Sequence, residues 1–281
     1  MAGLTRFART LLRGHKAALV GGIIAALWLA VAILAPALVP YDPLAQDLSA
    51  RLEAPSGRHL FGADDLGRDI FSRVLYGARI SLPMGGFVVL LTGLIGVCVG
   101  AVSGYAGGTL DDVFMRVCDA VLAFPSLILA MAITAALGPS LNNAMLAIVA
   151  VLWPEYARIM RAQVLAVKEL EYVTAARAMG APAGRILWRH ILPNCLAPLI
   201  VKASLDVGNA ILIAAGLSFI GLGAVPPTPE WGAMVSIGRQ KFYEWWVATF
   251  PGLAILSVVM GFNFLGDGLQ DLLDPRLRRR P

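Results

Sequence analysis

The residues that most often carry catalysis or phosphate binding are sparse and scattered in this sequence. No G-x-x-x-x-G-K-[ST] pattern occurs, and no Gly-Lys pair, so the chain has no P-loop for a nucleotide phosphate. His15, His59 and His190 fall in three separate segments, and neither an HExxH nor a GxSxG pattern is present. The cysteines are three in number and far apart, which implies no disulfide framework. We therefore predict no catalytic residue, no metal site and no cofactor bound by this chain.

One ionisable side chain stands inside a long apolar segment. Asp206 is the only charged residue between Lys202 and Glu230. A charge at membrane depth costs at least about 2.5 kcal/mol, so such a residue is a functional candidate by default. However, Lys202 precedes Asp206 by four residues and lies on the same face of a helix. We interpret the two residues as an ion pair near the inner surface of a membrane.

A third stretch of the sequence contains few reactive side chains but predicts a definite backbone structure. Residues 171–194 read EYVTAARAMGAPAGRILWRHILPN. Residues 162–179 mostly favour helix, and Gly180 followed by Pro182 is a strong signal for a helix to stop. A second short helix is predicted from Pro182 to about Pro193, because proline is favoured in the first turn of a helix. The stretch therefore predicts helix, sharp turn, helix.

The first of these two helices ends in residues with almost no side-chain bulk, namely Ala175, Ala176, Ala178 and Gly180. Such a helix end can seat in a groove on another protein. A solvated loop with an ordinary glycine cap fits the same residues, so shape alone leaves both interpretations open.

The composition of the chain places these patterns in a membrane protein. Of its 281 residues, 58% are hydrophobic and only 15% are charged, whereas soluble domains are about 45–50% apolar and about 25% charged. A helix needs about 20 apolar residues to cross a bilayer. Several uncharged runs are long enough, and the turn signal at 138–140 divides the longest of them into two. The predicted spans are 17–39, 80–110, two spans within 120–154, 196–222 and 245–266.

Six spans place both termini on one side of the membrane. With the N-terminus inside, the inner segments hold fifteen Lys and Arg residues and the outer segments hold seven, with Lys202 at a helix end left out. This asymmetry favours cytoplasmic termini. It also accounts for the basic character of the chain, so no nucleic-acid partner is expected. The first apolar run is longer than the roughly 7–15 residues of a signal-peptide core, which predicts an uncleaved helix.

The predicted fold class is an all-α integral membrane protein with six transmembrane helices, an external insert after the first helix and a cytoplasmic helix-turn-helix loop between the fourth and fifth. The segments are a cytoplasmic N-terminus (1–16), the first span (17–39), the external insert (40–79), a five-helix core (80–270) that includes the cytoplasmic loop (161–195), and a basic cytoplasmic tail (271–281).

Two finer patterns predict packing. Four glycines recur at every fourth position of the second span, which allows another helix to approach closely; they stand at 96, 100, 104 and 108. In the insert, apolar residues recur at helical spacing and predict an amphipathic helix against the outer face of the membrane domain. These residues are Leu66, Ile70, Phe71, Val74 and Leu75.

The helix-turn-helix stretch resembles the EAA loop of permease subunits in ABC importers, whose pattern is EAA, three residues, Gly, nine residues, then I-x-L-P. The residues in register are Ala175, Ala176, Gly180, Leu192 and Pro193. Thr174 stands where the pattern has Glu, and His190 where it has Ile. The resemblance implies that this loop seats in a cleft of a cytoplasmic ATPase. The coupling residues that it implies are Glu171, Thr174, Ala175, Ala176, Arg177, Gly180, Leu192 and Pro193, with Glu169 and Arg185 as further charged neighbours.

Other blocks of the sequence narrow the resemblance. They are HLFGADDLGRDIFSRVLYGARISL (59–82), LGPSLNNA (137–144), RHILPN (189–194), LSFIGLGAVPPTPEWGAM (217–234) and FNFLGDGLQDLLDPR (262–276). In this order they are similar to the DppC/OppC class, one of the two permease subunits in importers of dipeptides, oligopeptides, nickel or related solutes.

The resemblance implies a multi-pass permease subunit in the bacterial inner (plasma) membrane that belongs to a binding-protein-dependent ABC importer. The implied partners are a second homologous permease, two ATP-binding subunits that carry ATP and Mg²⁺, an extracytoplasmic solute-binding protein and the lipid bilayer. The insert and the loop PPTPEWGAM (226–234) are both candidates for contact with the binding protein. The solute and the residues along its path stay open.

Two other classes of function fit less well. A secondary transporter driven by an ion gradient would need internal ionisable residues paired across spans, and it often shows an inverted repeat. Here only Asp206 is available and no repeat is visible. An integral membrane enzyme would need a cluster of acid, base or metal-binding residues at one face of the membrane, and no such cluster is found in the sequence.

Overall fold

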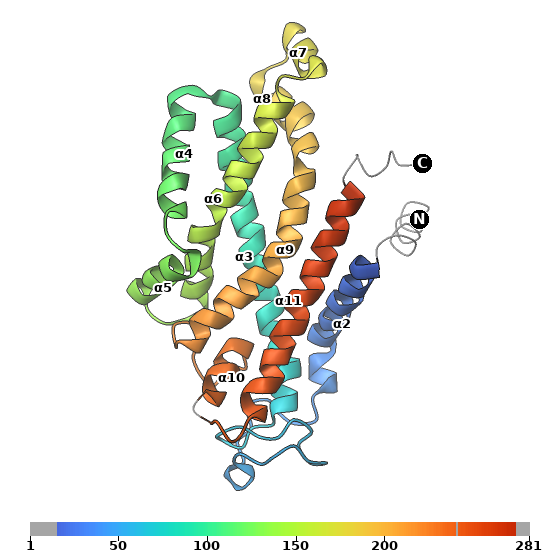
Figure 1. The fold of residues 1–281 in the computed structure, drawn as a ribbon, viewed down its shortest axis with the longest axis vertical. Helices are drawn as coiled ribbons and strands as arrows, with labels where there is room; N and C mark the ends of the chain where they lie inside the picture. The colour runs from blue at the N-terminus through green and yellow to red at the C-terminus, as the bar shows by residue number, and fades with distance from the viewer. Residues whose placement is uncertain (1–15, 240, 274–281) are drawn as a thin grey trace.

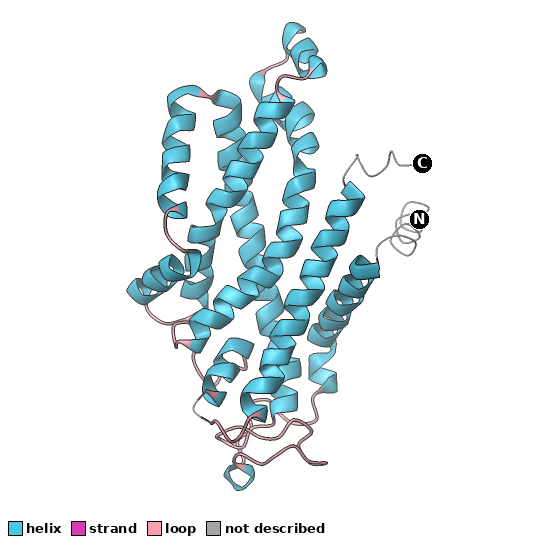
Figure 2. Cartoon of the chain, in the orientation of Figure 1, coloured by secondary structure: helices cyan, strands magenta, loops and turns pink. Residues whose placement is uncertain are grey.

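The structure is a computed structural model that describes residues 16–239 and 241–273. Nearly all of the predicted N-terminal segment (1–16) and most of the predicted tail (271–281) lie outside the described residues. Within these two ranges the chain folds into helices joined by loops, with no strand beyond one isolated bridge (Figure 2). The all-α prediction is confirmed for this part of the chain.

The helices follow one another with short connections, except for the insert after the first. They are α2 (Lys16–Leu38), the 3-10 turn η1 (Leu48–Ala50), α3 (Ile70–Ala106), α4 (Gly108–Leu122), α5 (Ser126–Leu137), α6 (Leu141–Val167), α7 (Glu171–Ala178), α8 (Ala183–Arg185), the π-helical turn η2 (Ile186–Ile191), α9 (Leu192–Phe219), α10 (Trp231–Gly238) and α11 (Trp246–Leu273).

Four helices among the described residues are long and apolar enough to cross a membrane. They are α2, α3, the continuous helix Ala183–Phe219 and α11. Together, α4 and α5 pass the same test as a pair bent by 91°, which gives a fifth candidate. Helix α6 has 27 residues, which is long enough to cross, but its second half carries Glu155, Arg158 and Arg161. The first, fifth and sixth predicted spans correspond to α2, α9 and α11.

The insert does not contain a separate amphipathic helix, which corrects the prediction. The apolar residues after Ile70 form the first turns of α3, which runs without a break into the second predicted span. Asp69 caps this helix, because its carboxylate accepts a hydrogen bond of 2.7 Å from the N–H of Ser72. Pro83 lies inside α3 and does not end it. The predicted boundary of the insert at residue 79 therefore falls within a helix.

The third predicted span is also divided differently. Helix α3 ends at Ala106, and Gly107 at φ +66° reverses the chain, so α4 begins at Gly108. A second break follows Leu122, because Pro125 cannot continue a helix and disfavours helical backbone in the residue before it. The 12 residues of α5 are too few to cross a bilayer alone.

The glycine pattern of α3 produces the expected close approach of helices. A Cβ atom added at Gly96 would overlap the Cβ of Tyr156, and one at Gly100 would overlap the carbonyl of Ala157, so α6 lies directly on this face of α3. Gly104 faces α6 in the same way. Gly108 differs, since it belongs to α4 and faces open space.

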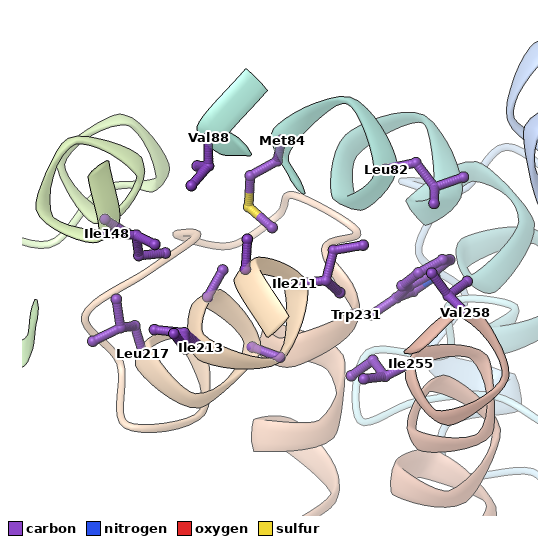
Figure 3. Close-up of a cluster of buried hydrophobic side chains, with 14 of the residues drawn as sticks. Leu82, Met84, Val88, Ile148, Ile211, Ile213, Leu217, Trp231, Ile255 and Val258 are labelled. Atoms are coloured by element: carbon purple, nitrogen blue, oxygen red, sulfur yellow. The ribbon is translucent and has the colours of Figure 1, made fainter. Parts of the chain in front are cut away.

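The main hydrophobic core lies among α3, α6, α9, α10 and α11. Figure 3 shows side chains of these helices pointing toward one another, and the labelled residues are Leu82, Met84, Val88, Ile148, Ile211, Ile213, Leu217, Trp231, Ile255 and Val258. Trp231, the first residue of the short helix α10, is completely buried, and its indole N–H donates a 2.9 Å hydrogen bond to the carbonyl of Val74. This anchor fixes α10 against α3.

The long helices run along the long axis of the molecule (Figure 1). The insert and α10 gather at one end, and α7 and α8 project from the opposite end. We call these the insert end and the loop end. Lys16 of α2 and Leu273 of α11 both lie at the ends of their helices that point away from the insert.

Candidate functional site

The candidate site is the loop between α6 and α9, and its first part departs from the prediction. The helix expected over 162–179 is two helices, because α6 ends at Val167 and α7 begins at Glu171. The ammonium group of Lys168 donates a 3.1 Å hydrogen bond to the carbonyl of Gly104 at the end of α3. This contact ties the end of α6 to the bundle and leaves α7 as a separate short helix.

The predicted sharp turn is confirmed. Gly180 has φ +79°, a left-handed backbone conformation that glycine adopts without steric cost. The N–H of Ala181 bonds to the carbonyl of Ala176 at 3.2 Å, and the N–H of Met179 bonds to that of Ala175 at 3.0 Å. These bonds satisfy carbonyls at the end of α7 that would otherwise be unpaired.

The second helix is longer than predicted. It does not stop near Pro193 but continues through α8, η2 and α9 as a single helix, Ala183–Phe219. The π-helical turn Ile186–Ile191 directly precedes α9, and Pro193 is the second residue of α9, a position in the first turn where proline is tolerated. The loop is thus joined to α9 by one continuous helix.

The predicted coupling residues divide into exposed and covered positions. Exposed to solvent are Glu171, Thr174, Ala175, Arg177, Gly180 and Pro193, while Leu192 is half-buried. Ala176 is only 3% exposed. It lies on the same face of α7 as Val173, three residues earlier, which is buried in one cluster with Ile186 and Ile191 of η2. The further charged neighbours Glu169 and Arg185 are exposed.

Two exposed apolar side chains of the loop were missed from the sequence. Met179 is 81% exposed and Trp188 is 64% exposed, one on each side of the turn at Gly180. Tyr172 is partly exposed on the same loop. Large apolar residues this exposed are typical of a surface that another protein covers. The signal available in the sequence was a tryptophan within an otherwise basic segment.

The loop is held in shape by one small hydrogen-bonded group. The carbonyl of His190 accepts a 2.7 Å bond from the amide of Asn194 and a 3.2 Å bond from the hydroxyl of Tyr172. The same amide also donates to the Tyr172 hydroxyl at 3.1 Å. These contacts link α7 to the start of α9, and Asn194 was not recognised in this role from the sequence.

Below the loop, ion pairs connect the helices that support it. Arg161 of α6 makes two bonds of 2.6 Å to the carboxylate of Asp111 on α4. Asp111 is also hydrogen-bonded by the buried hydroxyl of Ser103 at the end of α3. The three residues thereby join α3, α4 and α6.

The predicted pair of Lys202 and Asp206 is confirmed, and it has a third member. The ammonium group of Lys202 lies 3.0 Å from Asp206 and 2.6 Å from Glu155 of α6. The i, i+4 pair could be read from sequence, whereas Glu155 is 47 residues away. Among the described residues, no group of three or more His, Cys, Asp or Glu could hold a metal ion.

Comparison with known proteins adds independent information. Residues 96–279 match the family described as binding-protein-dependent transport system inner membrane component, and residues 4–55 match the N-terminal transmembrane domain of oligopeptide transport permease C. A probable D,D-dipeptide transport system permease of Escherichia coli K12 is 51% identical over 267 residues, which cover 95% of this chain and 90% of the relative.

Two further relatives cover the chain equally well. A dipeptide transport system permease of Alkalihalophilus pseudofirmus is 48% identical over 95% of this chain and 88% of its own length. A glutathione transport system permease of Pectobacterium atrosepticum is 45% identical over 97% of this chain and 91% of its own. The similarity therefore extends over both the insert end and the loop end.

Proposed function

Because the chain belongs to the family of inner-membrane components of binding-protein-dependent transport systems, we propose that it forms half of a translocation path for short peptides. It is a multi-pass permease of the inner membrane. The relatives are transport permeases for a D,D-dipeptide, a dipeptide and glutathione. All three are short peptides or closely related solutes, and this supports the same solute class here.

The proposed topology has six spans with cytoplasmic termini. The spans are α2, α3, the bent pair of α4 and α5, α6, α9 and α11. This arrangement is supported by the position of the basic α6–α9 loop, which lies at the end of the bundle opposite the insert (Figure 1). An excess of Lys and Arg marks cytoplasmic loops, so the loop end is assigned to the cytoplasm and the insert end to the outside.

The proposed complex contains a second homologous permease, two ATP-binding subunits that hold ATP and Mg²⁺, and a solute-binding protein outside. The observation that carries the coupling role is the exposed loop of α7 and η2, with Met179 and Trp188 uncovered and a continuous helix leading from it into α9. When the ATPases close, a displacement of the loop would move α9 directly. Glu171, Arg177 and the other exposed charges lie at the rim of this contact, where ion pairs contribute about 0–1 kcal/mol each.

The proposal is tested by isolating the complex from native membranes in detergent and identifying what accompanies this chain by mass spectrometry. We expect a second permease of similar size and ATPases with P-loops, and ATP-dependent uptake of dipeptides when the complex is placed in liposomes with its binding protein. If the chain purifies alone and moves solute without ATP, the ion-gradient transporter replaces the importer.

The topology is tested separately with two matched glycines. Gly184 in the loop and Gly57 in the insert both face open space, so a cysteine fits at either position. In a background without the native cysteines, we expect an impermeant maleimide added to intact spheroplasts to label Gly57→Cys and to spare Gly184→Cys. The reverse pattern would invert the proposed orientation.

A further inference from the structure

A cavity of about 480 Å³ opens at the insert end. Its walls come from the insert, the connection between α5 and α6, the end of α9 and the helix α10. The residues that matter for its chemistry are Asp65, Ser218, Ser236, Arg239 and Lys241. The volume is in the range of about 300–1,000 Å³ that is typical of sites for small ligands.

The cavity has ionisable groups of both signs. Arg239 and Lys241 follow α10, and neither forms a salt bridge within the described residues. The guanidinium of Arg239 lies 5.1 Å from the centre of the Phe219 ring. This cation–π contact holds the guanidinium in position but does not neutralise its positive charge. Two cations and one carboxylate give the lining an excess of positive charge, which favours an anionic group.

Asp65 supplies the opposite charge. Its side chain is 35% exposed, and its Oδ1 lies 3.6 Å from Arg68 Nη2, too far for a hydrogen bond. The guanidinium of Arg68 is directed instead to Asp64, with Nε at 2.6 Å from the carboxylate. The carboxylate of Asp65 therefore retains acceptor capacity for a cationic group.

The walls are fixed by their own hydrogen bonds. Ser218 accepts from the N–H of Ala224 at 3.2 Å, and the hydroxyl of Ser236 donates to the carbonyl of Phe219 at 2.7 Å. The buried Glu230 caps α10 by accepting from the N–H groups of residues 232 and 233. Burial raises the pKa of the Glu230 carboxyl, and these two bonds oppose the rise. With its walls so braced, the cavity exists before any solute arrives.

We propose that this cavity is a receiving site for the charged ends of a short peptide, with Arg239 and Lys241 binding the terminal carboxylate and Asp65 binding the terminal ammonium group. The inference rests on the proposed peptide function. A peptide with free ends carries both charges at neutral pH, because the ordinary pKa is about 3.3–3.7 for a terminal carboxyl and about 7.7–8.0 for a terminal amine. The partial exposure of the site suits a solute that must be released again.

The experiment measures peptide binding to the purified permease and ATPase complex in detergent, without the binding protein. The probes are Ala-Ala, Ala-Ala amide and N-acetyl-Ala-Ala, and the method is saturation-transfer NMR. We expect free Ala-Ala to bind at least about tenfold more tightly than the amide, since hydrogen bonds to charged groups are the strong ones. The doubly substituted Arg239→Gln, Lys241→Gln variant should bind both peptides equally weakly, and Asp65→Asn should abolish the preference over the acetylated peptide.

Arg58→Gln is the matched control. Arg58 is an exposed cation of the insert that pairs with Asp47 and does not line the cavity, so this variant should keep the preference for free peptide. The proposal is overturned if the wild-type complex binds no free dipeptide, if it does not distinguish the three probes, or if the double variant retains the preference.

Failure of the receiving site and failure of the peptide function give different results. ATP-dependent uptake of Ala-Ala by the wild-type complex in liposomes reports on the proposed function alone. A complex that takes up Ala-Ala but shows no effect of the cavity substitutions keeps its function and loses this site. A complex that takes up no peptide contradicts the proposed function itself.

Discussion

The two ends of the bundle differ in the kinds of residue that they contain and in the contacts that these residues make. The insert end is held by buried charges, each matched to a partner within the chain. The loop end presents alanines, a glycine turn and exposed apolar side chains, with few ties to the rest of the molecule. The difference teaches that one end is fixed by contacts within the chain, while the other leaves its largest apolar side chains uncovered.

The buried charges at the insert end form a connected group. Arg68 and Arg73 are both almost completely buried, and Asp64 lies 2.6 Å from the first and 3.6 Å from the second. Arg73 also donates to the carbonyls of Pro43 and Pro227, at 2.9 and 3.4 Å. One guanidinium thus joins the insert, α3 and the connection between α9 and α10.

The loop end differs from this network in the exposure of its charged residues and in its hydrogen bonds. Its charged residues, among them Glu171, Arg177 and Arg185, are exposed to solvent. Its side-chain hydrogen bonds include those that Tyr172 and Asn194 donate to the carbonyl of His190. Its largest apolar side chains, Met179 and Trp188, are exposed, at 81% and 64%.

The largest predicted effect tests the insert end. Asp64→Asn leaves Arg68 and Arg73 buried without their common carboxylate, and breaking one partner of a buried ion pair costs about 3–5 kcal/mol. We expect a marked fall in the melting temperature of the purified chain in detergent. The control is Asp42→Asn in the same insert, which keeps the acceptor for the N–H of Leu44 and is exposed. Equal melting temperatures for the two variants would show that the network does not hold the insert.

The next effect tests the loop end through its turn. Gly180→Leu should leave the chain inserted and lower ATP-dependent uptake at least about tenfold, because a side chain at this exposed turn obstructs seating against a partner. It also strains the backbone, since a left-handed residue other than glycine costs about 1–2 kcal/mol.

Gly180→Ala separates strain from obstruction. It carries the same backbone strain at φ +79°, but its single methyl group adds far less bulk to the turn. Its uptake should therefore stay well above that of Gly180→Leu. If the two variants lose uptake equally, strain rather than obstruction explains the loss.

A smaller effect is expected where the loop itself is packed. Ala176 lies on the buried face of α7, and Ala178 lies on its exposed face. Ala176→Leu should loosen α7 by about 1–3 kcal/mol through overpacking, whereas Ala178→Leu should not. Hydrogen exchange of the amides of 171–178 in the purified chain measures both. Equal protection in the two variants would mean that α7 is not seated on η2 as described.

The comparison also shows which features the sequence could predict. Local signals were sufficient where one residue decides the backbone, as at the Gly180 turn, or where two residues lie one helical turn apart, as in the pair of Lys202 and Asp206. They were insufficient for prolines, whose effect depends on the neighbouring turns. Pro125 breaks the third predicted span, whereas Pro193 is accommodated after a π-helical turn and Pro83 lies within α3.

Partners distant in the chain were not predictable from local pattern. Glu155 joins the Lys202 pair from another helix, and Asn194 braces α7 across the turn. In the insert, apolar residues at helical spacing do lie in a helix from Ile70 onward, but this helix is the start of α3 and not the separate amphipathic helix that was predicted. These contacts depend on how the helices pack against one another, and such packing leaves no recognisable pattern among neighbouring residues of the sequence.

The smallest predicted effect sharpens the contrast at the loop end. Tyr172→Phe removes a hydroxyl that bonds the His190 carbonyl and the Asn194 amide, yet that carbonyl keeps its 2.7 Å bond from Asn194. Because the group is exposed, the loss should be at the low end of about 0.5–1.5 kcal/mol per hydrogen bond. Asn194→Ala removes the other member, and a double variant should cost less than the sum, since the two side chains share partners. Hydrogen exchange of α7 and η2 measures the loss of stability in all three variants. Strictly additive losses would mean that Tyr172 and Asn194 stabilise the loop independently and do not form one bracing unit.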